Sequence, residues 1–237
     1  SRQHENYLLS PITFMTAADF KRSWRAYYTE KRIVHQWLQV DLACRLPDVR
    51  TVLEVGPHLG LVTAMLAHAG FAVTTLDISD APPRTGASGH IRSDVRALEA
   101  ERLRGFDCIL CCETLEHIHW PDIDGALGAF ARSRSPWLIM SVPYEGTQVG
   151  LSLYWNRYVF RKRSFLRKFR ALRRYPITDD ADFDAHKWEV GYAGHSLAAL
   201  KRKVEAAGWA VQDQHFTSGC RSVFLVCRNR SVTGDGI

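Results

Sequence analysis

The chain has 237 residues, of which 46% are hydrophobic and 24% are charged. This length suits one α/β domain with some elaboration, and no apolar run approaches the roughly 20 residues of a membrane-spanning helix. The first residues, SRQHENYLLSPITF, lack the apolar core and small-residue cleavage site of a signal peptide. The six cysteines show no spacing typical of a disulfide framework. We therefore predict a reduced, cytoplasmic protein without a transmembrane segment.

The net charge of +6 is concentrated in one segment. Residues 151–174 hold nine arginines and lysines and no acid, interleaved with aromatic residues, so the rest of the chain is net negative. Such a pattern suits RNA phosphates and bases, or an anionic membrane surface or lipid headgroup. A third interpretation is a solvated lid helix, neutralised by the acidic run at 179–184. We favour the lid helix.

Strand-like and helix-like segments alternate along the chain. Residues 18–46 have helical periodicity, with Ile33, Trp37 and Val40 on one face, and predict one or two helices. Ser196 is expected to cap a later helix at its N-terminus, and Gly70 to end an earlier one. The expected strands are 50–55, 71–79, 90–95, 106–113, 137–143, 209–216 and 220–228, and the expected helices between and before them are 60–69, 122–132 and 197–207.

This alternation predicts an α/β fold with a doubly wound, mainly parallel, seven-stranded Rossmann-like sheet. The last two strands are expected to form a C-terminal antiparallel hairpin. We predict an N-terminal helical cap or lid over residues 1–48, a core of 49–143 and 191–228, an insertion of 144–190 that contributes to a substrate pocket, and a frayed tail of 229–237.

Acidic side chains stand where several of these strands end. Ligands of open parallel sheets bind at the carboxyl ends of the strands, which here hold Glu54, Asp77, Asp94 and Glu113. Glu54 opens VLEVGPHLG, which has only G-x-x-x-G and therefore lacks the G-x-G-x-x-G of a dinucleotide site. Glu54 would repel a pyrophosphate but suits a cationic ligand, and Asp77 can accept both ribose hydroxyls. An adenosine that carries a cationic amino acid, S-adenosylmethionine, fits both acids.

Five segments in this order, VLEVGPHLG, TTLDIS, SDVRAL, FDCILCCETLEHI and WLIMSVP, resemble the class I S-adenosylmethionine-dependent methyltransferases. The resemblance covers about residues 50–145 and the closing LAALKRKVEAAGWAV, and is strongest to small-molecule enzymes with an L-E-H sequence after the fourth strand. It implies S-adenosylmethionine as the cofactor.

The resemblance also implies roles for single residues. Glu54, Gly56 and Gly60 would flank the methionine end of the cofactor. His58 departs from the family, which often has glycine there, and would narrow the loop or cover the methionine carboxylate. Asp77 with Ile78 would contact the ribose, and Asp94 with Val95 would contact the adenine. Cys112 with Glu113 would form the floor beneath the sulfonium.

Three residues are candidates for catalysis. His117, in LEHIH, is either a general base or a cap that orients its turn. Tyr144, in VPYEG, would face the transferred methyl group, or it belongs to a simple turn. His186, in HKWEVG, would line an acceptor pocket. The residues expected to contact substrate are Tyr28, Tyr144, Glu145, His186, Trp188 and Glu189.

For two of these substrate residues a purely structural role is the alternative. Trp188 could simply anchor the insertion to the core. Tyr28 belongs to a lid that could hold a sulfonium by cation–π contact, or to a helix packed on the sheet.

No metal is expected, because the histidines and acids show no ligand spacing. Cys108 and Cys111 form a C-x-x-C, but an odd separation within a strand directs them to opposite faces of the sheet.

We predict in-line methyl transfer to an oxygen, nitrogen or carbon of a small molecule, by a monomer or homodimer. One alternative is attack on the aminobutyrate chain of the cofactor, by cyclisation or aminocarboxypropyl transfer, with release of methylthioadenosine. Others are an RNA methyltransferase that uses residues 154–174 and a non-catalytic cofactor-binding scaffold. A nucleic-acid partner is not favoured, because no N/D-P-P-Y/F tetrapeptide follows the fourth strand.

Overall fold

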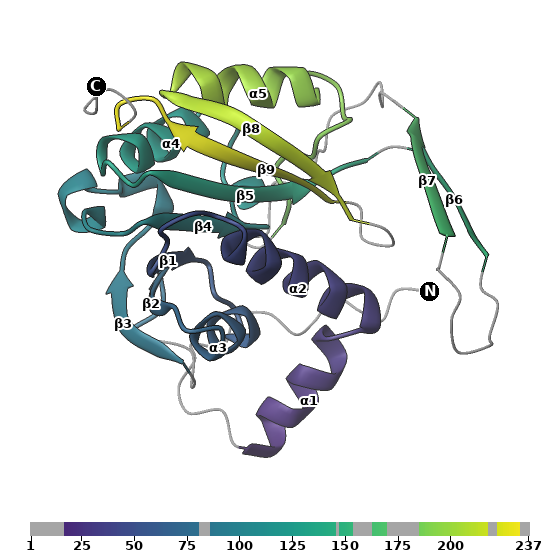
Figure 1. The fold of residues 1–237 in the computed structure, drawn as a ribbon, viewed down its shortest axis with the longest axis horizontal. Coiled ribbons are helices and arrows are strands. Elements are labelled where there is room, and N and C mark those ends of the chain that lie inside the picture. The colour runs from purple at the N-terminus through teal and green to yellow at the C-terminus, as the bar shows by residue number, and fades with distance from the viewer. Residues whose placement is uncertain are drawn as a thin grey trace.

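A mainly parallel sheet with an antiparallel edge forms the centre of the molecule (Figure 1). The structure is a computed structural model that describes residues 17–80, 86–145, 147–153, 163–169, 185–217 and 222–232. The sheet has seven strands in the order β3-β2-β1-β4-β5-β9-β8. Their bounds are β1 (Thr51–Val55), β2 (Ala72–Asp77), β3 (Ala87–Arg92), β4 (Cys108–Cys112), β5 (Trp137–Pro143), β8 (Trp209–Phe216) and β9 (Ser222–Asn229).

The strand directions confirm the predicted fold class. β1 pairs in parallel with β2 and β4, β2 with β3, and β4 with β5, whereas β9 runs antiparallel to both β5 and β8. The central strands β1 and β4 are buried on both faces, which explains their continuous apolar sequences. From β1, the strands continue in opposite directions across the sheet, to β2 and β3 on one side and to β4 and β5 on the other. Because β1, β2 and β4 are parallel, their carboxyl ends lie on one edge of the sheet.

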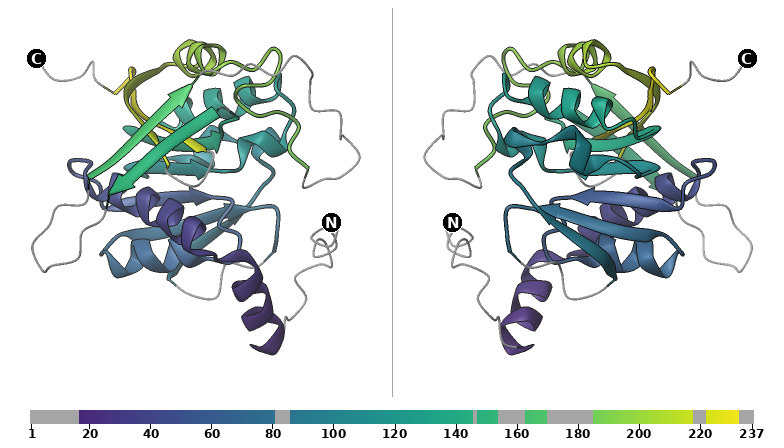
Figure 2. Two further views of the ribbon diagram at one scale, coloured as in Figure 1. Left: turned by 90° about the vertical axis from the view of Figure 1, so that its right-hand side faces the viewer. Right: turned by 90° about the vertical axis from the view of Figure 1, so that its left-hand side faces the viewer.

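Helices cover both faces of the sheet (Figure 2). α2 and α3 share one core with one sheet face, and α4 and α5 share another core with the opposite face. Cys108 lies in the first core and Cys111 in the second, as their spacing predicted. The helices are α1 (Ala17–Tyr27), α2 (Glu30–Cys44), α3 (Leu61–His68), α4 (Ile123–Arg132) and α5 (Leu197–Ala206), with short 3-10 turns η1 (Val95–Ala97), η2 (Ala100–Leu103) and η3 (Leu115–His117).

Local signals placed the helix ends correctly. The Ser196 hydroxyl accepts from the backbone N–H of Ala199 at 3.1 Å, which is the predicted N-terminal cap of α5. Gly70 follows α3 with a φ of 98°, a left-handed conformation that favours glycine. The expected frayed tail includes Asn229, which instead ends β9 in the core, where its amide donates to the carbonyls of Ala131 and Ser135.

The insertion after β5 contains a hairpin where a lid helix was expected. β6 (Thr147–Leu153) and β7 (Arg163–Phe169) pair antiparallel and form a separate two-stranded sheet beyond the end of β5 (Figure 1). The lid-helix prediction is therefore wrong for residues 163–169, since these residues pair with the preceding strand β6 in a hairpin. Residues 154–162 and 170–184, with most of the basic charge and the acidic run, lie outside the described residues.

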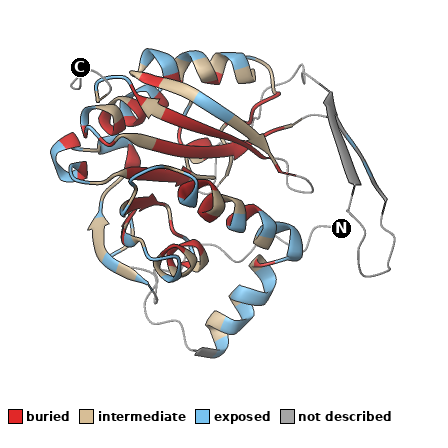
Figure 3. Ribbon diagram, in the orientation of Figure 1, coloured by how far each residue is buried: buried red, intermediate tan, exposed pale blue. Residues whose placement is uncertain are grey.

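The predicted inward face of the N-terminal helices is partly wrong. Val40 is buried, but Trp37 is 51% exposed, and α2 instead buries His35, Gln36 and Gln39. Figure 3 shows buried, intermediate and exposed residues along α2. The imidazole of His35 packs against Phe224 of β9 with ring centroids 4.9 Å apart. Burial lowers the pKa of His35 to about 4, so this histidine is neutral in the folded protein near pH 7.

In the described residues no helix is long and apolar enough to cross a membrane.

We predict that His35 makes the protein sensitive to acid. Its folded-state pKa lies below its ordinary value of 6.5, so below that pH only the unfolded state takes up the proton. Between pH 7 and pH 4 the free energy of unfolding should therefore fall by up to about 3 kcal/mol through this residue. Urea unfolding of the wild type and of His35→Leu at several pH values measures both free energies of unfolding. The advantage of the wild type over the variant should fall by this amount between pH 7 and pH 4. A pH-independent difference would contradict the prediction, and the exposed His68 provides a matched control as His68→Leu.

Candidate functional site

The first site residue is a buried acid at the end of β1. Glu54 is 4% exposed, and its carboxylate accepts a hydrogen bond of 2.6 Å from the Thr63 hydroxyl of α3. Burial raises the pKa of Glu54 to about 7, against the opposing effect of the Thr63 bond. A cationic group beside Glu54 would compensate this buried charge, as the sequence predicted.

The turn after Glu54 has an unusual backbone conformation. Gly56, His58 and Gly60 all have positive φ, at 71°, 48° and 78°. A Cβ at Gly56 would meet the Thr114 hydroxyl at 2.6 Å, so glycine is required there for space as well as for φ. The turn leads into α3, so its backbone amides surround the N-terminus of that helix.

The junction of α1 and α2 packs onto this turn. The His58 ring lies 4.2 Å from the Tyr27 ring, centroid to centroid, and the Tyr28 hydroxyl accepts from the N–H of Leu61 at 3.4 Å. Tyr28 is 7% exposed, and burial raises its pKa to about 12. The structure therefore packs Tyr28 against the glycine turn, and its predicted contact with substrate remains a prediction.

Asp77 and Ile78 lie at the end of β2, next to the Glu54 turn. One Asp77 oxygen accepts from the backbone N–H of Ser79 at 2.8 Å, which holds the carboxylate at the sheet edge. Ile78 follows with a side chain that is 47% exposed. An apolar surface beside a carboxylate suits a nucleoside, because the carboxylate can accept from ribose and the apolar side chain can contact the base.

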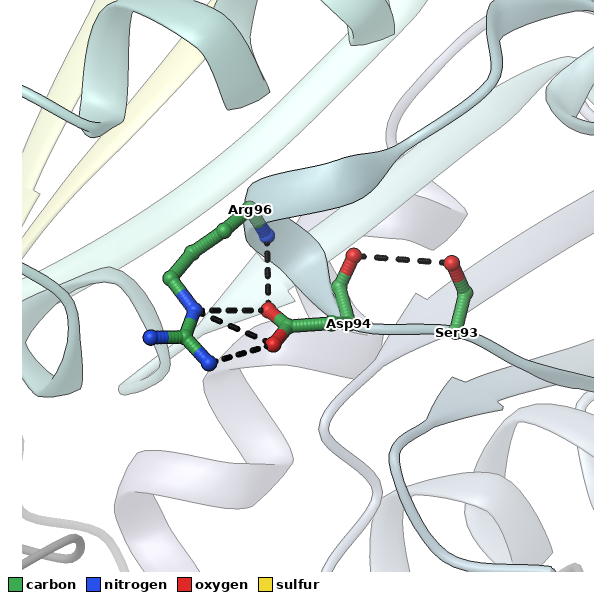
Figure 4. A network of polar contacts seen from close by, with 3 residues as sticks. All are labelled: Ser93, Asp94 and Arg96. Carbon is green, nitrogen blue, oxygen red and sulfur yellow. Dashed lines mark hydrogen bonds and ion pairs between the residues drawn. The ribbon is translucent and has the colours of Figure 1, made fainter.

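Asp94 is engaged by a neighbouring arginine (Figure 4). Its carboxylate accepts from the backbone N–H of Arg96 at 2.8 Å and from the Arg96 guanidinium at 3.0 Å. These bonds lower the pKa of Asp94. The same carboxylate also caps η1, whose first residue, Val95, is buried. Asp94 is therefore a fixed, ionised group at the sheet edge, and its predicted contact with adenine remains a prediction.

Cys112 and Glu113 form the end of β4. Glu113 has a φ of 51°, which is strained for a residue with a side chain, and its carboxylate accepts from the Ser141 hydroxyl at 2.8 Å. Burial raises the pKa of Glu113 to about 7 and also raises that of the Cys112 thiol, so the thiol is neutral. A strained, partly buried acid at a strand end is typical of a functional site.

The turn after β4 binds a segment from far along the chain. The N–H of Lys187 donates to the Glu116 carbonyl at 2.7 Å, and the Trp188 indole N–H donates to the carbonyls of Leu115 and Ile118 at 3.2 and 3.1 Å. Trp188 is fully buried. It is thus an anchor of the insertion, and the prediction that it contacts substrate is wrong.

This anchoring brings two predicted catalytic histidines together. The rings of His117 and His186 meet edge to face with centroids 4.9 Å apart. The Nδ1 atom of His186 lies 2.9 Å from a carboxylate oxygen of Glu189, which is itself 7% exposed. The sequence did not single out Glu116, which is fully buried beside them, although it is the middle residue of the L-E-H motif.

Tyr144 and Glu145 are placed differently from the histidines. The Tyr144 side chain is 9% exposed and packs against Phe216 with ring centroids 5.1 Å apart. The backbone N–H of Glu145 donates to the Val190 carbonyl at 2.7 Å, so this turn pairs with the end of the insertion. Tyr144 thus borders the strand-end edge from a packed position, and its predicted role in catalysis remains a prediction.

A family model described as a methyltransferase domain matches residues 26–214. The chain belongs to this family. A ubiquinone biosynthesis O-methyltransferase of Hahella chejuensis is 26% identical over 175 residues, which cover 70% of this chain and 66% of that protein. Its counterpart in Caulobacter vibrioides is 33% identical over 91 residues, or 34% of this chain and 36% of that protein. The chain spans between about a third and two thirds of the length of such curated relatives.

Solved structures share the fold at low sequence identity. The 1,6-didemethyltoxoflavin-N1-methyltransferase of Burkholderia thailandensis matches with a TM-score of 0.56 and 17% identity, over 93% of this chain and 94% of that one. Magnesium protoporphyrin IX methyltransferase from Synechocystis PCC 6803 matches with a TM-score of 0.54 and 16% identity, over 90% and 92%. The predicted class I methyltransferase is therefore confirmed for the family and the fold.

We predict that Gly56→Ala destabilises the protein more than Gly105→Ala. Both glycines have positive φ, which costs a residue with a side chain about 1–2 kcal/mol, but nothing lies within 4 Å of a Cβ at Gly105. At Gly56 the Cβ would also displace Thr114, whose hydroxyl donates to the Val55 carbonyl, and this should add about 1–3 kcal/mol. Chemical unfolding of both variants measures the difference. Equal losses would show that the Thr114 contact is unimportant.

Proposed function

We propose that this methyltransferase transfers the methyl group of S-adenosylmethionine to a hydroxyl group of a small-molecule acceptor. The observation that carries the proposal is the placement of Glu54 and Asp77 at the ends of adjacent strands, on either side of the glycine turn. The names of the curated relatives, which are O-methyltransferases, favour oxygen as the acceptor atom.

The residues at the strand ends fit the cofactor. Glu54 would face its ammonium, since the carboxylate is buried and its ionised form lacks a positive partner in the described residues. Asp77 would accept from ribose, with Ile78 against adenine. The cofactor, when bound, supplies a methyl group already activated by its sulfonium. The protein therefore mainly has to bind, orient and exclude water.

The pair His117 and His186 would serve the acceptor. A hydroxyl that keeps its proton at neutral pH needs a base before its oxygen becomes a good nucleophile. Glu189 holds the Nδ1 atom of His186, so the Nε2 atom of that ring is the one available to an acceptor. Among the predicted catalytic residues these two histidines form the only pair in direct ring contact in the described part of the chain.

We also propose a cytoplasmic enzyme of small-molecule metabolism, monomeric or homodimeric. An RNA acceptor is not favoured by the described residues, because Glu54, Asp77 and Glu113 lie at or next to the carboxyl ends of β1, β2 and β4 and make this edge acidic. An RNA-binding surface would instead be basic.

Calorimetric titration with S-adenosylmethionine, followed by incubation with small phenolic and enolic acceptors and mass spectrometry, tests the function. Accumulation of S-adenosylhomocysteine together with a methylated acceptor is expected. Methylthioadenosine as the by-product would indicate attack on the aminobutyrate chain, and binding without turnover would indicate a scaffold. Absence of binding would overturn the proposal.

We predict that cofactor binding at pH 6.5 releases a proton from Glu54. The free pKa of about 7 leaves this acid largely protonated, and a bound ammonium favours its ionised form. Calorimetry in buffers of different ionisation enthalpy measures the release, which Glu54→Gln should abolish while weakening binding by about 10–100-fold. Asp77→Asn is the matched control and should weaken binding while leaving the release intact. Unchanged proton release in Glu54→Gln would contradict the assignment.

A further inference from the structure

The turn after β4 and the start of the last segment of the insertion form a cluster of possible metal ligands. Glu116, His117 and His186 each offer one ligand atom, and these atoms all lie within 4.8 Å of one another. Ligands on one first-row divalent ion, at bond lengths of about 2.1 Å, are separated by at most about 4.2 Å. Small side-chain rotations would therefore bring all three onto a single ion.

Glu116 gives an independent indication of a missing partner. Its side chain is fully buried, and neither carboxylate oxygen has a hydrogen-bond partner. Buried carboxylates without partners are rare in folded proteins, because ionised oxygens lose their water without replacement, and an unseen ion is one of the few explanations. The carboxylate faces the two histidines, which are only partly buried, so an ion could reach it from solvent.

The charges around the cluster favour a cation. Glu113 precedes Glu116 by three residues in the same turn, and Glu189 holds the Nδ1 atom of His186 at 2.9 Å. In the described part of the chain, no arginine or lysine forms an ion pair with Glu113 or Glu116. Three acids thus share one region with two neutral or protonated imidazoles, and a divalent cation would balance them.

The cluster is also held in place as metal sites are. The bonds from Lys187 and Trp188 fix the insertion to the turn, and Glu189 engages the Nδ1 atom of His186 at 2.9 Å. A carboxylate on one imidazole nitrogen orients the ring and leaves the other nitrogen for a metal, which is the usual outer arrangement of metal-bound histidines.

We propose that Glu116, His117 and His186 bind a divalent transition cation. Two imidazoles and one carboxylate suit Zn²⁺, Mn²⁺ or Fe²⁺ better than Mg²⁺ or Ca²⁺, which take oxygen ligands. Three protein ligands leave positions open for a further molecule. Resting on the proposed function, the acceptor hydroxyl would occupy an open position, where it loses its proton more easily beside a metal ion. The ion would then take over the activation of the hydroxyl that the Nε2 atom of His186 would provide without a metal. This replaces the sequence-based expectation of no metal, because the third ligand comes from a distant segment.

The test measures metal binding directly, without cofactor or acceptor. Chelator-treated full-length protein would be titrated with Zn²⁺ by calorimetry and with Co²⁺ by visible absorption, with Mg²⁺ for comparison. We expect one Zn²⁺ per chain at this site, a tetrahedral or five-coordinate Co²⁺ spectrum, and weaker Mg²⁺ binding. Glu116→Gln and His186→Asn should each weaken Zn²⁺ binding by at least about 100-fold. The exposed His119, two residues beyond His117, is the matched control, and His119→Gln should bind as the wild type.

Thermal unfolding keeps the result interpretable. Zn²⁺ should raise the melting temperature of the wild type and of His119→Gln but not that of Glu116→Gln. Glu116→Gln should itself fold, because glutamine is uncharged and has nearly the same shape as the glutamate side chain. Absence of Zn²⁺ and Co²⁺ binding in the wild type, or binding that both site variants retain, would overturn the proposal. No methyl transfer is measured in this test, so a failure to bind metal would leave the proposed methyltransferase function standing. Conversely, metal binding by a protein that transfers no methyl group would support the metal site and contradict the proposed function.

Discussion

One indole N–H holds together the part of the site that lies beyond the cofactor. Trp188 donates to two carbonyls of the turn after β4, at Leu115 and Ile118, from a fully buried position. These carbonyls follow a strand end and have no strand partner of their own, and the Leu115 carbonyl accepts in addition from the backbone N–H of Ile118 at 3.3 Å. The residues on either side of Trp188 are fixed by this contact, and His186 and Glu189 take their positions against η3 because of it.

The sheet supplies the other half of the arrangement. β1, β2 and β4 are parallel neighbours, so their carboxyl ends place Glu54, Asp77 and Glu113 on a single edge. These three acids are far apart in the sequence. The fold therefore concentrates negative charge without any acidic run in the described sequence, and that concentration distinguishes this edge from a phosphate-binding site, which needs free N–H groups and cations.

The sequence predicted what depends on local geometry. The alternation of strands and helices predicted the sheet, and single glycine and serine residues predicted the helix ends. Glu54 and Asp77 could be placed at strand ends from the sequence alone. Predictions failed where distant segments decide. Trp37 has the hydrophobicity of a core residue, yet the face of α2 that meets the sheet carries His35, because the orientation of a helix is set by all its contacts.

The same reason explains the mixed outcome in the insertion. HKWEVG contains both a structural anchor, Trp188, and a candidate catalytic residue, His186. The spacing of the residues does not show which of them has which role. Only the contact of Trp188 with the β4 turn separates them, and only that contact brings His186 to Glu116. Likewise, residues 163–169 pair as a strand because residues 147–153 lie beside them. A pattern within one segment cannot contain information about a partner that the fold provides.

The buried acids have a cost in the free protein that a ligand can remove. Burial raises the pKa of both Glu54 and Glu113 to about 7, which means that ionising them in the folded state is unfavourable at lower pH. Such groups weaken the fold as the pH rises through their ordinary range, since the unfolded chain ionises them freely. A protein retains this arrangement where bound positive charge offsets it. An ammonium at Glu54 and a sulfonium above the end of β4 would provide that charge, so the cost of these acids and a selectivity for a cationic cofactor would have one physical origin.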